Sequence, residues 1–172
     1  EFSNRATLIN TLVTSSQVRR AMAELESQGH TTAKLQRLAL RHAKLIAADM
    51  SYAKIRIFLS LLTWFWNRLY NGVHVKGLHE LAETSTTHTL VYVPSHRSHV
   101  DYLVLSYALY TRGLMIPHIA AGDNLNMPIV GRFLRGGGAF FMRRSFREDP
   151  LYAAVFSEYV YQMARRGHCL EF

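Results

Sequence analysis

The hydrophobic pattern changes its period at Asn71–Gly72, and this change limits the folds open to the chain more than any other feature. Before it, apolar residues recur at helical spacing. Ser15–Ser16 offers an N-cap for a helix from Gln17 to Gln28, and Thr31–Thr32 caps a second helix through about Asp49. The pattern therefore predicts a helical region over residues 1–72.

After Asn71–Gly72, segments of strand and helix character alternate. Strands are expected near residues 89–93, where the apolar run is typical of a buried strand, and near 115–121 and 138–142. Helices are expected near 99–111, 126–134 and 151–166, and residues 168–172 would open a fourth strand. Such alternation favours a parallel sheet covered by helices. We therefore predict an α/β fold in which a helical region precedes a core with a mostly parallel sheet.

The composition excludes several classes of protein. With 172 residues and 49% apolar side chains, the chain can bury a core and is not disordered. Its single cysteine, Cys169, cannot form an internal disulfide and is expected to be a small buried residue. The formal charge of +8, in which sixteen arginines dominate, predicts an anionic partner such as a phosphate or carboxylate.

A third helix, expected from Ser51 to Tyr70, contains the most apolar run of the chain, Ile57–Trp66. Ten residues rise only about 15 Å as a helix, whereas a bilayer core is about 30 Å thick. One interpretation is an interfacial helix with Trp64, Trp66 and Tyr70 at the level of lipid headgroups. The other is a core helix of a bundle.

The segment Pro94-Ser-His-Arg-Ser-His-Val-Asp101 lies where the first strand passes into a helix, the place where α/β sheets bind ligands. Ser98 and Asp101 have the spacing of a capping box, which would bring the Asp101 carboxylate within reach of His96. A histidine held in this way could act as a general base. Alternatively, Asp101 is only a cap. A metal site formed by His96, His99 and Asp101 is disfavoured, because no further ligand cluster is evident.

Arginines gather around the glycine-rich turn Gly136–Gly138: Arg132, Arg135, Arg143, Arg144 and Arg147. The glycines allow close backbone approach, and the arginines could neutralise a dianion such as a small metabolite phosphate. The alternative interpretation is a solvated basic surface.

The two segments together resemble a known family. His96-Arg-Ser-His-Val-Asp101 is similar to the His-x4-Asp block of the glycerolipid acyltransferases, and Gly138-Ala-Phe-Phe-Met-Arg-Arg144 is similar to their second block, in the expected order and separation. Residues 117–126, 151–159 and 64–70 narrow the resemblance to the bacterial membrane-bound glycerol-3-phosphate acyltransferases. The resemblance extends from about residue 6 to residue 172.

This resemblance implies acyl transfer from acyl-CoA or acyl-carrier protein to the sn-1 hydroxyl of glycerol 3-phosphate, which gives lysophosphatidate for phospholipid synthesis. His96 would remove the hydroxyl proton, and Asp101 would orient His96 and balance its charge. Arg144 would bind the substrate phosphate, with Arg143, Gly138 and Arg97 as further substrate-binding residues. No metal or redox cofactor is implied. Residues 73–172 would form the N-terminal part of the catalytic domain.

The resemblance also implies a place in the cell. Its members work at the cytoplasmic side of the cell inner membrane, so we expect peripheral contact of residues 52–70 with a phospholipid surface and no nucleic-acid partner. The third block of the family, Glu-Gly-x-Arg-Ser-Arg, is absent up to Phe172, so we expect a fragment with an incomplete pocket. The alternative function is a non-catalytic basic module that binds anionic lipid or nucleic acid.

Overall fold

The computed structural model describes residues 4–69, 73–95 and 101–172. Its helices are α1 (Arg5–Thr14), α2 (Ser16–Ser27), α3 (Thr32–Ile46), α4 (Tyr52–Leu69), α5 (Leu78–Ser85), α6 (Asp101–Thr111), the 3-10 helix η1 (Asp123–Leu125), α7 (Val130–Gly136) and α8 (Pro150–Arg165). Its strands are β1 (Val91–Tyr92), β2 (His118–Gly122), β3 (Ala139–Met142) and β4 (Leu170–Glu171). This order confirms the predicted helical region followed by an α/β core.

Local capping explains where several helices begin. The Ser15 hydroxyl accepts a hydrogen bond from the backbone N–H of Val18 at 3.3 Å and so starts α2. Thr31 holds the N-cap position of α3 with extended backbone but without a side-chain hydrogen bond. Asp149 caps α8, whose first residue, Pro150, has no N–H to satisfy.

The four described strands form one sheet in the order β1-β4-β2-β3, and all three pairings are parallel. The predicted parallel sheet is therefore confirmed. The expectation that residues 89–93 form a buried strand is wrong. Because β1 lies at an edge of the described sheet, Val91 is 55% exposed and Val93 is 78% exposed.

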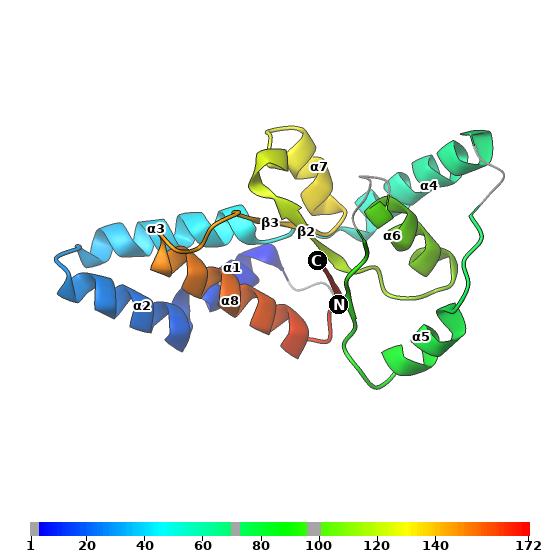
Figure 1. Ribbon diagram of the computed structural model, residues 1–172. Coiled ribbons are helices and arrows are strands. Elements are labelled where there is room, and N and C mark those ends of the chain that lie inside the picture. The colour runs from blue at the N-terminus through cyan, green and yellow to red at the C-terminus, as the bar shows by residue number, and fades with distance from the viewer. Residues whose placement is uncertain (1–3, 70–72, 96–100) are drawn as a thin grey trace.

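The described residues form two hydrophobic clusters. Figure 1 shows the helices that carry them on the two sides of the sheet, α1–α3 and α8 on one side and α4 and α6 on the other. The larger cluster joins the helices of the N-terminal region to α8 and to the sheet residues Phe140 and Leu170. The smaller one joins the inner face of α4 to partly buried residues of α6. The N-terminal helices α1–α3 therefore share one core with part of the α/β core.

The structure supports the core interpretation for one face of helix α4. Ile55, Leu59, Leu62 and Trp66 recur at helical spacing and are buried against α6. Trp64 points to the opposite side and is 66% exposed. Trp66, by contrast, is only 4% exposed, so the expectation that it lies at headgroup level is wrong. In the part of the chain that the structure describes, no helix has the length and apolarity needed to cross a bilayer.

Candidate active site

The two segments predicted to carry chemistry leave the sheet at the same edge. Because the strands are parallel, their carboxyl ends lie together, and ligands of open α/β sheets bind at that edge. Strand β1 leads through Val93–Ser95 toward α6, and β3 leads directly into Arg143 and Arg144. The topology therefore brings the end of β1 and the arginines after β3 to one edge.

The strand order sets the distance between these segments. Strands β4 and β2 lie between β1 and β3, so three interstrand spacings of about 4.8 Å separate β1 from β3 by about 14 Å. A ligand that reached from the end of β1 to the end of β3 would lie over the ends of β4 and β2.

The predicted base and its neighbour, His96 and Arg97, lie outside the described residues, as do Ser98 and His99. Asp101 is described: it is the first residue of α6, lies in the first turn of that helix and is partly buried. Among the residues that the structure describes, no three His, Cys, Asp or Glu side chains are grouped so that they could hold a metal ion.

Arg143 is held by a network of polar and aromatic contacts. Its guanidinium donates to Oδ2 of Asp149 at 2.8 Å, and its backbone N–H donates to the hydroxyl of Tyr152 at 3.0 Å. The guanidinium carbon also lies 4.4 Å from the centroid of the Tyr152 ring. Arg143 is thus engaged on three sides by the first turn of α8 and its cap.

The same network reaches the N-terminal helices. Nε2 of His42, a residue of α3 that is 1% exposed, lies 3.1 Å from Oδ2 of Asp149, and its ring meets Tyr152 edge-to-face. Burial lowers the pKa of His42 below its usual value, although the Asp149 carboxylate opposes this shift. His42 is therefore neutral near pH 7, and the charge of Asp149 is left to Arg143.

Arg144 differs from Arg143 in its surroundings. It is exposed, and among the described residues its side chain enters no hydrogen bond or ion pair. A cation at the carboxyl edge without a protein partner can bind an anionic ligand without first breaking another contact. The structure thus separates the two adjacent arginines into a held residue and an available one.

Two other arginines of the predicted cluster, Arg135 and Arg132, have hydrogen-bond partners of their own. Arg135 is buried and donates to the carbonyls of Leu45 and Ala47, so it satisfies the C-terminus of α3. Burial lowers the pKa of Arg135 to about 10. Arg132 of α7 is exposed and donates to the carbonyl of Pro128, in the turn that precedes the helix. Arg135 is therefore a structural residue.

Gly138 lies at the amino end of β3, so six residues of nearly extended chain, about 20 Å, separate it from Arg144. Its φ is +105°, a conformation that favours glycine, and a Cβ built there would lie 2.3 Å from Cε of Met50. Gly138 therefore does not lie beside Arg144. Its backbone conformation explains why this position is a glycine.

Sequence reasoning missed two acidic residues beside this edge. The role of Asp149 as a helix cap could have been predicted from the sequence, since an aspartate before proline is typical of a helix start. Nothing in the sequence indicates its contacts with His42 and Arg143. Glu171 is fully buried at the end of β4, paired in register with Tyr92. Burial, with contributions from Cys169 and Glu171, raises the pKa of Tyr92 to about 12.

Comparison with known proteins gives a consistent result. The sequence model of the family described as Acyltransferase matches residues 72–172. A glycerol-3-phosphate acyltransferase of Pseudomonas putida KT2440 is 47% identical over 173 aligned positions, and those of Pseudomonas paraeruginosa PA7 and Pseudomonas aeruginosa PAO1 are each 48% identical. Each alignment covers 100% of this chain and 21% of the relative, so the chain spans about a fifth of the length of these curated relatives.

Proposed function

Because the chain belongs to the acyltransferase family, we propose that it is part of an enzyme that acylates glycerol 3-phosphate. The donor is acyl-CoA or acyl-carrier protein, the acceptor is the sn-1 hydroxyl, and the product is 1-acyl-glycerol 3-phosphate. The observation that carries this proposal is the available Arg144 at the same sheet edge as the end of β1, in a chain whose relatives are named glycerol-3-phosphate acyltransferases.

In this proposal His96 removes the proton of the substrate hydroxyl as the oxygen attacks the thioester carbonyl. The carbon–oxygen bond forms, the carbon–sulfur bond breaks, and the proton passes from His96 to the departing thiolate. Asp101 orients His96 and stabilises its charged form. Because the substrate oxygen is the nucleophile, the reaction needs no covalent enzyme intermediate and no metal or redox cofactor.

Arg144 binds the substrate phosphate in this mechanism, and Arg143 positions it. The contacts of Arg143 with Asp149 and Tyr152 support this division, because they occupy its guanidinium and its backbone N–H. The spacing of about 14 Å between β1 and β3 leaves room for a three-carbon substrate over the ends of the strands between them. Arg97 is a further candidate for substrate contact.

The test is acyl transfer from palmitoyl-CoA and palmitoyl-carrier protein to glycerol 3-phosphate by the full-length protein. His96→Ala and Asp101→Ala should each lower the rate by about 10² to 10⁴, the usual contribution of a general base. His88→Ala is the matched control, because His88 is an exposed histidine just before β1. Wild-type activity in His96→Ala would overturn the mechanism, and an inactive parent with both donors would overturn the function.

A second pair of variants tests the proposed contact between Arg144 and the substrate phosphate. Arg144→Ala should raise the KM for glycerol 3-phosphate and leave the KM for the acyl donor unchanged. Arg147→Ala removes an exposed arginine three residues away and should change neither. Equal effects of the two substitutions would show that only the basic surface matters.

We also propose that the protein lies at the cytoplasmic face of the inner membrane as a peripheral protein. Large apolar side chains remain exposed on α4 and around α7, among them Ile57 (62%), Trp64 (66%) and Ile129 (81%). The two helices are in contact, since Phe58 and Phe133 meet edge-to-face at 5.3 Å, so these side chains belong to one surface. Exposed cations at Lys54, Arg56 and Arg132 border it, as suits an anionic phospholipid surface.

Vesicle flotation tests this membrane contact. Burial of a large apolar side chain contributes about 1.5–3 kcal/mol, so Trp64→Ala should weaken binding to anionic phospholipid vesicles about tenfold or more. Tyr161→Ala is the control, because Tyr161 is an exposed aromatic residue of α8, outside this surface. Flotation unchanged by Trp64→Ala would contradict the proposal.

A further inference from the structure

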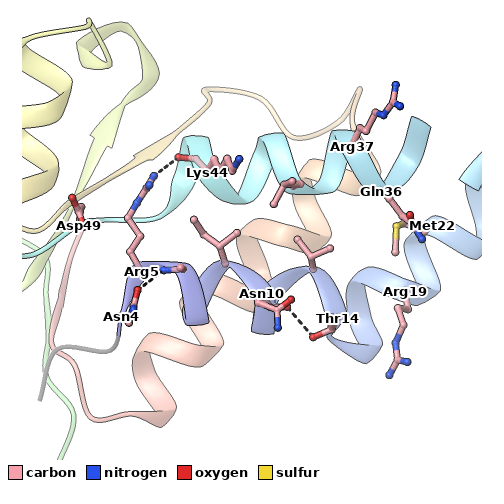
Figure 2. A pocket seen from close by; sticks show the side chains of 14 residues that line it. Asn4, Arg5, Asn10, Thr14, Arg19, Met22, Gln36, Arg37, Lys44 and Asp49 are labelled. Carbon is pink, nitrogen blue, oxygen red and sulfur yellow. Dashed lines mark hydrogen bonds between the residues drawn. The ribbon is translucent and has the colours of Figure 1, made fainter. Parts of the chain in front are cut away.

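The N-terminal helices form a groove away from the sheet edge that carries the proposed chemistry. It lies between α1, α2 and α3 and has a volume of about 980 Å³ (Figure 2). Its apolar side chains include Ile9 and Val13 of α1, Met22 of α2 and Leu40 of α3. Leu40 is 39% exposed although it is a large apolar residue in the middle of a helix. Apolar side chains at the base of the groove, which we call its apolar floor, are therefore accessible to solvent.

The groove is strongly cationic. Arg5, Arg19, Arg37 and Lys44 line it, against one acidic residue, Asp49, so its lining carries a net charge of +3. The surrounding helices are biased in the same way: residues 5–46 contain seven Lys and Arg and two Glu, which is +5 of the +8 of the whole chain. Among the described residues, the side chains of Arg19, Arg37 and Lys44 enter no ion pair or hydrogen bond.

The positions of these cations indicate the kind of ligand. Arg5 and Lys44 lie at one end of the groove, and Arg19 and Arg37 lie at the other (Figure 2). A single-chain amphiphile carries its charge at one end and would leave the other pair of cations unmatched. Arg37 and Lys44 are seven residues apart on α3, a rise of about 10.5 Å or two helical turns. A partner helix with acidic residues two turns apart matches both.

The size of the groove agrees with such a ligand. Two turns of an α-helix about 10 Å across occupy about 820 Å³, close to the volume of the groove. We propose that the groove binds an acidic amphipathic helix of a protein partner, whose apolar stripe covers Leu40 and its neighbours while its carboxylates meet Arg37 and Lys44. Recognition of this kind places apolar residues of the ligand at i, i+4 and i+7.

A synthetic helical peptide tests this proposal on the full-length protein. The probe carries leucines at i, i+4, i+7 and i+11 and flanking glutamates seven residues apart, and fluorescence anisotropy measures its binding. The double variant Arg37→Glu/Lys44→Glu should bind it at least about tenfold more weakly. The control is Lys34→Glu/Arg41→Glu, which makes the same change of charge on α3 at exposed residues outside the groove, and it should lose less than about threefold.

Two further measurements separate docking from general electrostatics. Leu40→Ala keeps every charge and should still weaken peptide binding, because it removes part of the apolar floor. A peptide with lysine in place of glutamate should not bind. The proposal is overturned if the acidic peptide shows no saturable binding, or if the control variant loses as much as the groove variant. It is also overturned if the groove variant loses binding to anionic vesicles and none to the peptide.

Discussion

Replacing Asp149 with asparagine removes one negative charge while the N-cap of α8 stays in place. Asparagine caps helices about as well as aspartate, so the hydrogen bond to the backbone N–H of Tyr152 should persist. What is lost is the 2.8 Å contact with Arg143 and the 3.1 Å contact with His42. The substitution therefore isolates the charge of Asp149 from its role as a cap.

The expected loss of stability follows from how far the side chains of Arg143 and Asp149 are exposed to solvent. The side chains of Arg143 and Asp149 are 38% and 26% exposed, so solvent screens their attraction to about 1 kcal/mol. Asp149→Ala also loses the cap, which adds about 1 kcal/mol. Hydrogen exchange over residues 143–155 should therefore report local stability losses of about 1 kcal/mol for Asp149→Asn and about 2 kcal/mol for Asp149→Ala.

Kinetics distinguish a positioning role from a merely structural one. If the contact with Asp149 holds Arg143 and thereby fixes Arg144, Asp149→Asn should raise the KM for glycerol 3-phosphate about fivefold, the equivalent of about 1 kcal/mol. The KM for the acyl donor should not change. Unchanged KM for glycerol 3-phosphate, despite faster hydrogen exchange, would refute the reasoning and leave the network with a structural role only.

Two further predictions concern single residues in the fold. Gly138→Ala should destabilise the protein by about 1–3 kcal/mol in urea unfolding, because its φ of +105° lies well outside the left-handed helical minimum at about +57°. The added Cβ would also meet Cε of Met50, but this is the end of a flexible side chain that can move aside. Gly167→Ala, where φ is +74° and nothing lies within 4 Å, should cost less, and equal costs would show that the larger φ of Gly138 does not matter. Burial lowers the pKa of His118 from 6.5 to about 4 in the folded protein, so the unfolded chain binds the proton more tightly. The contribution of His118 to the free energy of unfolding should therefore fall as the pH drops from about 6.5 to 4, by up to about 3 kcal/mol. His118→Gln should remove this contribution and leave the smaller pH dependence that His42 supplies.

The sequence predicted the elements that carry strong local signals. Caps such as Ser15 and the alternation of strands and helices follow from short-range chemistry, and the structure confirms both. Helix α5 was missed, because it has only eight residues, buries only Leu78 and begins after Gly77, which offers no side-chain cap. The exposure of β1 was missed for another reason. Whether an apolar strand lies inside a sheet or at its edge depends on strand order, which a local pattern does not contain.

In the candidate site, too, some features could be predicted from local sequence and others depend on the tertiary arrangement. The spacing of His96 and Asp101 and the arginines after β3 are visible in the sequence. Parallel topology alone brings the end of β1, which leads toward Asp101, to the same edge as Arg143 and Arg144. Which of two adjacent arginines is available cannot be read from the sequence. That distinction depends on Tyr152 and Asp149, which reach Arg143 only once α8 has packed against the sheet.

His42 extends this argument to the N-terminal helices. It is 107 residues from Asp149 in the chain, so no local pattern links them, yet its buried ring packs against both Asp149 and Tyr152. Helix α3 therefore forms one wall of the network that holds Arg143, and the fully buried Phe140 of β3 joins the same core as α1–α3. If Arg144 binds the substrate phosphate, the helical region contributes to catalysis without touching the substrate, because it supports the side chain next to the one that does.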